Sequence, residues 1–310
     1  MLKKIIFMGT PFFAVPILKS LYQNGYPISV VYTQPPQKSQ RGQKINKSPV
    51  QRISETLNID YRTPSNLRNN KEEYEYLKKL DADLAIVVAY GQIIPKEFLS
   101  LTKKGFINIH ASLLPKWRGA APIQRSIMDL EKETGISIMK IEEELDTGPI
   151  CNSYKIKITN KDNAEIVSEK LSLIAAEKIL DNIDNILEDK INFQRQNHSE
   201  ATYASKIEKS EGQIKWNETA EKIIGKVNGL CPNPGAFFVY KGERYKILKA
   251  ELTTIVGEVG EVLDDYLEIA CGNKKSIKVL KIQRQGKRVQ DISEFMLGSQ
   301  IKRGSNLNNA

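Results

Sequence analysis

The chain has 310 residues, 40% of them hydrophobic and 27% charged, which is typical of a globular protein with room for two domains. No run approaches the ~18 apolar residues of a membrane helix, and four apolar residues before Gly9 are too few for a signal peptide. The net charge of +9 is compatible with a polyanionic partner, and three isolated cysteines without CxxC spacing argue against disulfides or zinc and favour the cytoplasm.

Strand and helix patterns alternate through the first part of the chain. Near-continuous apolar runs predict buried strands, and Ser48 followed by Pro49 predicts the start of a helix. Alternating strands and helices predict a doubly wound, mostly parallel, Rossmann-like α/β sheet over residues 1–188. The expected strands are 3–9, 28–33, 83–91, 106–110 and 135–143, and the expected helices are 14–24, 48–58, 122–132 and 163–190.

The remainder of the chain changes character. A polar link is expected over residues 189–208, and a helix at 217–230 opens the next region. Short alternating segments separated by glycine turns then predict a small, OB-like C-terminal β-barrel domain over residues 209–310. Its tail, 304–310, is polar and is expected to be disordered.

Two polar residues interrupt the apolar strand "GFINIHAS". Asn108 and His110 are two positions apart, so they share one face of a strand. Ligands of open α/β sheets bind at the carboxyl ends of strands, where an amide and an imidazole could polarise a carbonyl oxygen. The alternative is a buried histidine satisfied by a backbone carbonyl.

A second polar cluster, "EEELDTGPI", contains Asp146 after another predicted strand. A carboxylate facing the imidazole of His110 would fix its tautomer. The alternative is that Asp146 is only a turn residue, because Asp-Thr-Gly-Pro is suitable turn chemistry.

The positive charge is concentrated in two stretches that contain no acidic residue, 34–52 and 272–290. They are either solvated faces of a basic protein or a footprint for a phosphate backbone. The cations of the first stretch are Lys38, Arg41, Lys44, Lys47 and Arg52; those of the second are Lys274, Lys275, Lys278, Lys281, Arg284, Lys287 and Arg288.

Several familiar motifs are missing. "MGTPFFA" after the first strand is neither a dinucleotide-binding nor a P-loop sequence, which argues against a nicotinamide oxidoreductase. No serine lies in a GxSxG elbow, and His198 is far from His110 in sequence, so neither a serine hydrolase nor a zinc site is expected.

The stretch "NIHASLLPKWRGAAPIQRSI" with "DTGPI" downstream resembles the signature of the folate-dependent formyltransferases. Further stretches resemble the branch of that family that formylates methionyl-tRNA, and together they cover nearly the whole chain. They are "IIFMGTPFFAVPIL", "TQPPQKSQRGQKINKSPV", "VVAYGQIIPK", "YASKIEKSEGQIKW" and "NGLCPNPGAFF". Residues 230–234 depart from the family's aromatic Asn-Pro-Trp-Pro type of stretch, which puts an aromatic contact there in doubt.

The resemblance implies transfer of the formyl group of 10-formyltetrahydrofolate to the amino group of methionine on initiator tRNA, by a cytoplasmic monomer without a metal. It implies that Asn108, His110 and Asp146 are catalytic. It implies donor binding by Ser112, Leu113, Leu114, Pro115, Tyr90 and Gly91, and tRNA binding by Lys38, Arg41, Lys44 and Lys47.

Other readings stay open at this point. A purine-pathway formyltransferase, a formyl-sugar enzyme and a formyltetrahydrofolate hydrolase share the signature, but a small substrate needs no long cationic track. A tRNA-binding protein without catalysis is the alternative from another class, and the intact catalytic trio argues against it.

Overall fold

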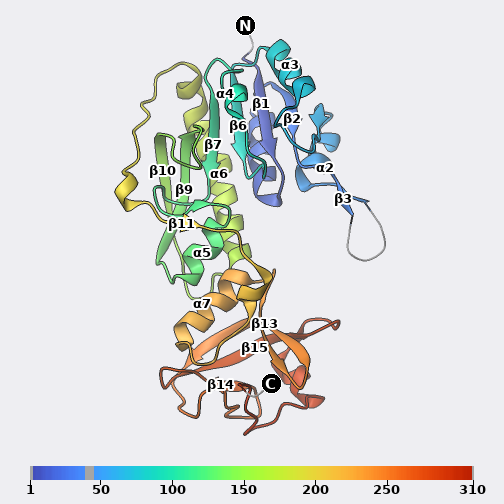
Figure 1. Ribbon diagram of the computed structural model, residues 1–310, viewed down its shortest axis with the longest axis vertical. Coiled ribbons are helices and arrows are strands. Elements are labelled where there is room, and N and C mark those ends of the chain that lie inside the picture. Colours follow the sequence, from blue (N-terminus) through green and yellow to red (C-terminus); the bar gives the residue numbers. More distant parts are fainter. Residues whose placement is uncertain (1–2, 39–44, 309–310) are drawn as a thin grey trace. The chain divides into compact units, whose positions relative to one another are not determined.

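The computed structural model describes residues 3–38 and 45–308, which form two compact units (Figure 1). The first unit contains the described residues up to Gly119, together with Thr134–Ile156 and Ser168–Tyr203. The second contains Ala120–Glu133, Lys157–Val167 and the described residues from Ala204 onward. The chain therefore passes between the units more than once. The predicted division into a first domain up to residue 188, a link over 189–208 and a second domain from 209 remains a prediction.

The first unit is built on a seven-stranded sheet with the strand order β10-β9-β7-β6-β1-β2-β5. The pairs β1–β2, β1–β6, β6–β7 and β2–β5 are parallel, and β7–β9 is antiparallel. This confirms the predicted doubly wound, mostly parallel α/β sheet. The strands are β1 Ile5–Gly9, β2 Ile28–Tyr32, β5 Tyr61–Arg62, β6 Leu84–Val88, β7 Phe106–His110, β9 Glu133–Lys140 and β10 Ile150–Lys157.

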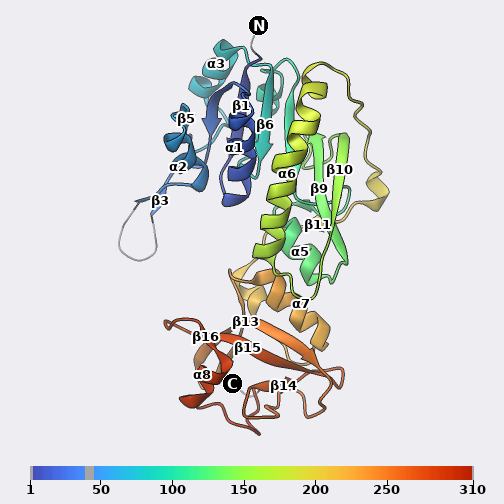
Figure 2. The ribbon, with the colours of Figure 1, turned by 180° about the vertical axis from the view of Figure 1, so that it is seen from behind.

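Helices cover both faces of this sheet. On one face, α1 and α6 lie in front of the strands in Figure 2, and Ser172 donates a hydrogen bond to the carbonyl of Phe13 at 2.8 Å. On the other face, Leu77 and Phe98 pack with the strand residues Met8 and Val87. The helices of this part are η1 Phe12–Ala14, α1 Val15–Gln23, α2 Pro49–Thr56, α3 Lys71–Leu80, α4 Lys96–Leu99 and α6 Ala164–Leu187.

Local sequence explains most of these boundaries. All five residues of β1 and of β6 are buried, as their continuous apolar runs predict. Ser48 caps α2 by accepting a hydrogen bond from the amide of Gln51, which confirms the predicted helix start. Strand β10 was not predicted, because half of the residues in its sequence ICNSYKIK are polar; it forms the edge of the sheet and leaves several side chains exposed.

Two short ribbons and two short helices complete the connections. Strand β3, Gln37–Lys38, pairs with β4, Ile45–Asn46. Strand β8, Arg118–Gly119, pairs with β11, Tyr203–Ala204. The 3₁₀ helices are η2 His198–Glu200 and η3 Lys209–Gly212.

The second unit contains a curled antiparallel sheet, a half-barrel, with the order β12-β13-β15-β14 and β16 paired to β15. Register shifts between β13 and β15 provide bulges that bend long strands. The predicted smaller C-terminal β domain is thus confirmed. Its strands are β12 Ala236–Tyr240, β13 Glu243–Thr253, β14 Glu268–Ala270, β15 Ser276–Arg284 and β16 Gln290–Asp291, and its helices are α5 Pro122–Met128, α7 Ala220–Leu230 and α8 Ile292–Leu297.

Aromatic side chains form the centre of this second core. The rings of Trp216 and Phe238 lie 5.8 Å apart, and those of Phe238 and Tyr245 lie 5.4 Å apart. Helices α5 and α7 pack closely because α7 has glycines on the shared face: a Cβ at Gly229 would lie 2.6 Å from Cγ of Met128. Helix α7 therefore packs against α5 and also contributes to the core of the second unit.

The prediction of a disordered tail is wrong for residues 304–308. Val262 donates a hydrogen bond to the carbonyl of Ser305 at 2.9 Å, and Leu307 donates one to the carbonyl of Gly260 at 2.8 Å. The side chain of Leu307 is only 4% exposed. One apolar residue among small polar ones is enough to anchor the segment to the core of the second unit.

Candidate active site

Strand β7 carries the two polar residues singled out in the sequence. Asn108 lies opposite Val87 of β6, and His110 lies opposite Ser137 of β9, so the strand is held on both sides. Their side chains share one face because they are two residues apart. His110 is 6% exposed, whereas Asn108 is half-buried. A strand in the interior of the sheet thus fixes both backbones.

Asp146 comes to this same face from the loop that follows β9. Its Oδ1 lies 3.5 Å from the Nδ2 of Asn108, and its Oδ2 lies 3.6 Å from the Nδ1 of His110. Oδ2 also accepts a hydrogen bond from the amide of Gly119 at 2.8 Å. The structure therefore brings the three predicted catalytic residues together. The two long contacts are of the kind that tighten only when a substrate binds.

The second ring nitrogen of His110 is also engaged. Nε2 lies 3.0 Å from the carbonyl oxygen of Trp117, an acceptor, so this nitrogen carries the hydrogen. The sequence left two alternatives, a histidine bonded to a backbone carbonyl and a histidine facing a carboxylate. The structure has both: Nε2 contacts the carbonyl of Trp117, and Nδ1 faces Asp146. Its imidazolium form would direct both N–H groups toward oxygen atoms.

The predicted donor-binding loop, Ser112 to Pro115, is a fixed turn against β9. Ser112 Oγ donates to the carbonyl of Lys116 at 2.6 Å, and the amide of Leu114 donates to Ser137 Oγ at 3.1 Å. The side chains of Ser112 and Leu114 are buried, and those of Leu113 and Pro115 are half-buried. A ligand at this loop would therefore meet mainly backbone groups and the partly open Leu113 and Pro115.

Tyr90 and Gly91 follow the end of β6. The ring of Tyr90 is 2% exposed and belongs to the core cluster beside Phe98. Burial raises the pKa of its phenol, and the phenolic oxygen has no hydrogen-bond partner among the described residues. Its carbonyl accepts a hydrogen bond from Thr10 Oγ1 at 2.7 Å. Tyr90 thus presents backbone rather than side chain at this edge, next to the exposed Gly91.

The predicted tRNA-binding residues are only partly described. Lys38 lies on β3, whereas Arg41 and Lys44 lie outside the described residues. Lys47 is exposed and forms an ion pair with Glu55 at 2.8 Å. The first basic stretch therefore remains a prediction from sequence.

The second basic stretch is less uniformly positive in space than in sequence. Four of its seven cations form ion pairs with acidic residues from α7, β13, β16 and α8, which lie outside the stretch. The pairs are Lys275–Glu221, Lys281–Asp291, Arg284–Glu243 and Arg288–Glu294. Neutralised pairs contribute less to phosphate attraction than free cations, so the expected track is weaker here than the sequence indicates.

The cysteines are poor candidates for a covalent intermediate. Burial raises the pKa of the Cys151 thiol to about 11 and that of the Cys271 thiol to about 12. Burial also raises the pKa of Cys231. Because the thiolate is the nucleophile, none of the three is activated at neutral pH.

Two further residues near Asp146 were missed in the sequence. Arg118 is 2% exposed, and its Nη2 donates to Oε1 of Gln196 at 2.7 Å. Gln196 in turn donates to the carbonyls of Asp146 and Gly148, both at 2.8 Å. Arg118 lies inside the quoted "PKWRG" motif, so its position was a usable signal. Gln196 lies in the polar link and has no local motif.

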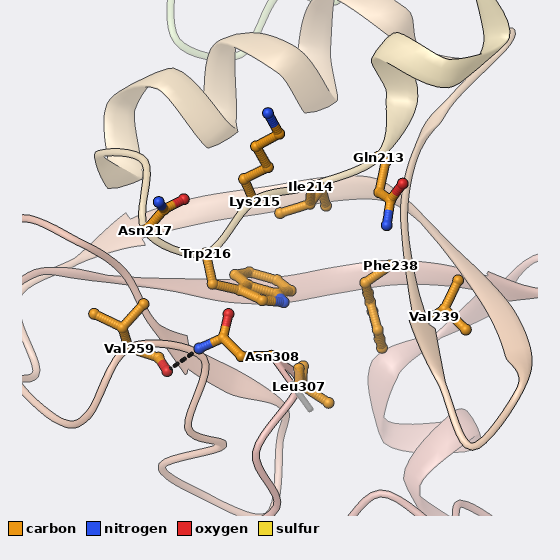
Figure 3. A pocket seen from close by; sticks show the side chains of 10 residues that line it. All are labelled: Gln213, Ile214, Lys215, Trp216, Asn217, Phe238, Val239, Val259, Leu307 and Asn308. Atoms are coloured by element: carbon orange, nitrogen blue, oxygen red, sulfur yellow. Dashed lines mark hydrogen bonds between the residues drawn. The ribbon is translucent and has the colours of Figure 1, made fainter. Parts of the chain in front are cut away.

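A pocket of about 380 Å³ lies within the second unit (Figure 3). The segment 213–217, β12 and the C-terminal residues Leu307 and Asn308 line it. The indole nitrogen of Trp216 is buried there without a hydrogen-bond partner among the described residues. None of the predicted catalytic, donor-binding or tRNA-binding residues lines this pocket.

Among the residues that the structure covers, no helix is both long enough and apolar enough to cross a membrane. The same residues include no group of three or more His, Cys, Asp and Glu side chains placed to hold a metal ion. 

Two family models match the chain. Residues 3–183 match the formyl transferase model, and residues 206–300 match the model of the formyl transferase C-terminal domain. A methionyl-tRNA formyltransferase of Pelagibacter ubique is 71% identical over 309 residues and covers 100% of both chains. One from Caldanaerobacter subterraneus is 40% identical, over 97% of this chain and 99% of that protein.

Solved structures with a similar fold are more distant in sequence. The sugar 3N-formyl transferase WlaRD, crystallised with dTDP and 5-N-formyl-THF, has a TM-score of 0.68 at 18% identity, over 93% of this chain and 100% of that one. An N-formyltransferase from Helicobacter canadensis, in complex with folinic acid and dTDP-3-aminofucose, has a TM-score of 0.69 at 21% identity, over 90% and 99%. At these identities the likeness concerns the fold.

Proposed function

Because the chain belongs to the formyl transferase family, we propose that it is an enzyme that transfers a formyl group to the amino group of methionine carried by tRNA. The observation that carries the proposal is the 71% identity to a methionyl-tRNA formyltransferase along the full chain. The meeting of Asn108, His110 and Asp146 at one edge of the sheet supports it. We propose 10-formyltetrahydrofolate as the donor and initiator methionyl-tRNA as the acceptor, with the enzyme acting as a cytoplasmic monomer.

Asn108 and His110 would stabilise the charge that develops during transfer. The amino nitrogen of the acceptor attacks the formyl carbon, and the formyl oxygen becomes negative. The Nδ2 of Asn108 has two hydrogens; one faces Asp146 at 3.5 Å, which leaves the other for the formyl oxygen. His110 lies two residues further along the same strand face. Its Nε2 donates to Trp117, so its Nδ1, which makes no hydrogen bond at 3.6 Å from Asp146, would be the second donor to the formyl oxygen, charged in the imidazolium form.

Asp146 would hold the imidazole and accept the proton that the amine loses. Its Oδ2 is fixed by the amide of Gly119 and faces the Nδ1 of His110 at 3.6 Å. This contact is too long for a hydrogen bond, which leaves the Nδ1 of His110 able to donate to a substrate oxygen. The bond from the formyl carbon to the donor nitrogen then breaks, and that nitrogen takes up a proton. The step needs no covalent enzyme intermediate.

The donor would lie against the backbone of the loop from Ser112 to Pro115 and the end of β6 at Tyr90 and Gly91. The two solved structures named above share this fold and contain a formylated folate, which supports a reduced folate as the donor. The exposed Gly91 and the half-buried Leu113 and Pro115 offer an edge that a flat ring could contact.

The acceptor tRNA would be bound by the basic stretches. We propose that Lys38, Arg41, Lys44 and Lys47 contact its phosphates. We propose further that residues 1–188 are the catalytic domain, 189–208 a link and 209–310 a tRNA-binding domain. Three cations of the second basic stretch lie outside its four ion pairs, Lys274, Lys278 and Lys287, and the exposed Lys274 and Lys287 would contribute most there.

A formyl-transfer assay tests this function. The purified protein is given 10-formyltetrahydrofolate with methionyl-tRNA, unacylated tRNA, free methionine or a dTDP-amino sugar. We expect formylation of methionyl-tRNA alone. Formylation of the amino sugar in its place, or hydrolysis of the donor without an acceptor, would assign the chain to another branch of the family.

Arg41→Ala separates acceptor from donor binding. We expect weaker methionyl-tRNA binding, with a salt dependence shallower by about one unit per lost phosphate contact. Binding of a folate analogue should stay unchanged. Equal tRNA affinities for the variant and the wild type across a salt series would remove Arg41 from the interface.

A further inference from the structure

We propose that Gln196 is a positioning residue for the reaction, which holds the Asp146 carboxylate toward His110 and is itself anchored by Arg118. This inference rests on the proposed function and extends it to a residue that no motif marks. All four residues belong to the first unit.

The carboxamide of Gln196 uses every hydrogen it has on the catalytic loop. Its Nε2 donates to the carbonyl oxygens of Asp146 and Gly148, each at 2.8 Å. Its Oε1 accepts from Nε and Nη2 of Arg118, at 3.1 and 2.7 Å. Only one orientation of the amide satisfies both sides, because the carbonyls cannot donate and the guanidinium cannot accept. At 7% exposed, Gln196 makes these contacts away from solvent.

Asp146 needs this support because of its backbone. Its φ is +53°, in the left-handed region that non-glycine residues rarely adopt. The loop is also confined behind Asp146, where a Cβ on Gly148 would lie 2.0 Å from the carbonyl oxygen of Lys140. The hydrogen bond to the carbonyl of Asp146 fixes the peptide plane that follows this residue, and the one to the carbonyl of Gly148 fixes the loop two residues further along. They therefore set the direction in which its side chain leaves the backbone.

Arg118 and its neighbour Gly119 link the backbone and the side chain of Asp146 through hydrogen bonds. Its side chain holds Gln196, which grips the Asp146 carbonyl, while the amide of the next residue, Gly119, donates to the Asp146 carboxylate at 2.8 Å. The backbone of Arg118 is fixed in turn by donation to the carbonyl of Thr202 at 2.8 Å. One short strand, β8, thus holds both ends of the catalytic aspartate.

Gln196→Glu is the sharpest variant, since it keeps the shape and the Arg118 contact but removes both hydrogens that bind the loop. We expect kcat to fall about tenfold, less than the ~100-fold that a 1 Å misplacement can cost, because Gly119 still holds the Asp146 carboxylate. The KM values for tRNA and donor should stay within about twofold. The melting temperature should fall by no more than a few degrees, because the new carboxylate pairs with Arg118 although it also faces the two carbonyl oxygens that Gln196 bound.

A double-mutant cycle shows whether Gln196 acts through Asp146. In an Asp146→Asn background, Gln196→Glu should reduce kcat little further, because the group it positions is already lost. The matched control is Gln194→Glu, an exposed glutamine two residues earlier, which should leave kcat unchanged.

A second readout does not depend on activity. The chain has two histidines, His110 and His198, so selective labelling gives two assignable imidazole signals. Gln196→Glu should shift the His110 signal, as the carboxylate near Nδ1 moves, whereas Gln194→Glu should not.

The outcomes separate the two proposals. Absence of formyl transfer by the wild type refutes the proposed function and leaves the imidazole signals to judge the positioning. With an active wild type, an unshifted His110 signal, full activity of Gln196→Glu, or losses that simply add in the cycle would overturn the role of Gln196.

Discussion

Arg118 and Arg284 show how differently the two units use the same side chain. Arg118 is 2% exposed in the first unit, and its hydrogen bonds go to an amide oxygen and toward Nδ1 of His198, at 3.4 Å. Arg284 lies on β15 of the second unit, its side chain 42% exposed, and pairs with the equally exposed Glu243. The buried arginine has one geometry and fixes its neighbours, whereas water can replace the partner of the exposed one.

The largest effect is expected at His110, toward which Arg118 and Gln196 are proposed to orient Asp146. His110→Ala should lower kcat about 100-fold or more, because it removes a charged donor from the developing oxyanion. Strand β7 is held between β6 and β9 in the interior of the sheet, so the circular dichroism spectrum should not change. A normal spectrum with near wild-type turnover would show that His110 has only a structural part.

Asp146→Asn should follow closely, with a loss of about 10- to 100-fold that falls on kcat. An amide still accepts from Gly119 but cannot balance an imidazolium, and its N–H₂ group can face His110 instead. Steady-state kinetics with each substrate varied checks this. A raised KM at constant kcat would mean that Asp146 binds substrate rather than serving His110.

Arg118→Met should lower the unfolding free energy of the first unit by about 1–3 kcal/mol, because Gln196 Oε1 is left buried without its donors. Turnover should fall as well, since Gln196 loses its anchor. The chain has two tryptophans, Trp117 in the first unit and Trp216 in the second, so urea unfolding followed in a Trp216→Phe background reports on the first unit alone. An unchanged urea midpoint of unfolding would show that the buried Arg118 stabilises its unit no more than the exposed Arg284 does.

Arg284→Met should have the smallest effect, a change in melting temperature of no more than about 2 °C, because exposed ion pairs contribute little. The rate of formylation at a limiting concentration of methionyl-tRNA tests whether the charge of Arg284 assists tRNA binding. A large drop in melting temperature would show that the pair with Glu243 is a structural element of the half-barrel.

The sequence predicts the residues whose neighbours are local. The doubly wound sheet, the half-barrel region and the shared face of Asn108 and His110 follow from apolar runs and a period of two. Asp146 was found because its turn follows a strand. Gln196 was missed because its partners lie 48 to 78 positions away, separations that no local pattern encodes. Arg118 was passed over because arginines are rarely buried.

The second basic stretch shows the same limit from the other side. No acid occurs between residues 272 and 290, yet Glu221, Glu243, Asp291 and Glu294 reach its cations from other elements. Strand β10 escaped prediction because an edge strand needs no apolar alternation. Charge and exposure depend on which segments the fold brings together.

The return of residues 305–307 onto the second unit affects how that unit folds during synthesis. Ser305 accepts from Val262, and Leu307 packs into a core in which it is the last residue to be made. A ribosome adds residues one by one, and domains fold as units once their parts have emerged. The segment around Gly260 and Val262 of the second unit therefore lacks its hydrogen-bond partners until Leu307 has left the exit tunnel. A nascent chain stalled before that point would offer this segment to chaperones and proteases, although the first unit has already emerged.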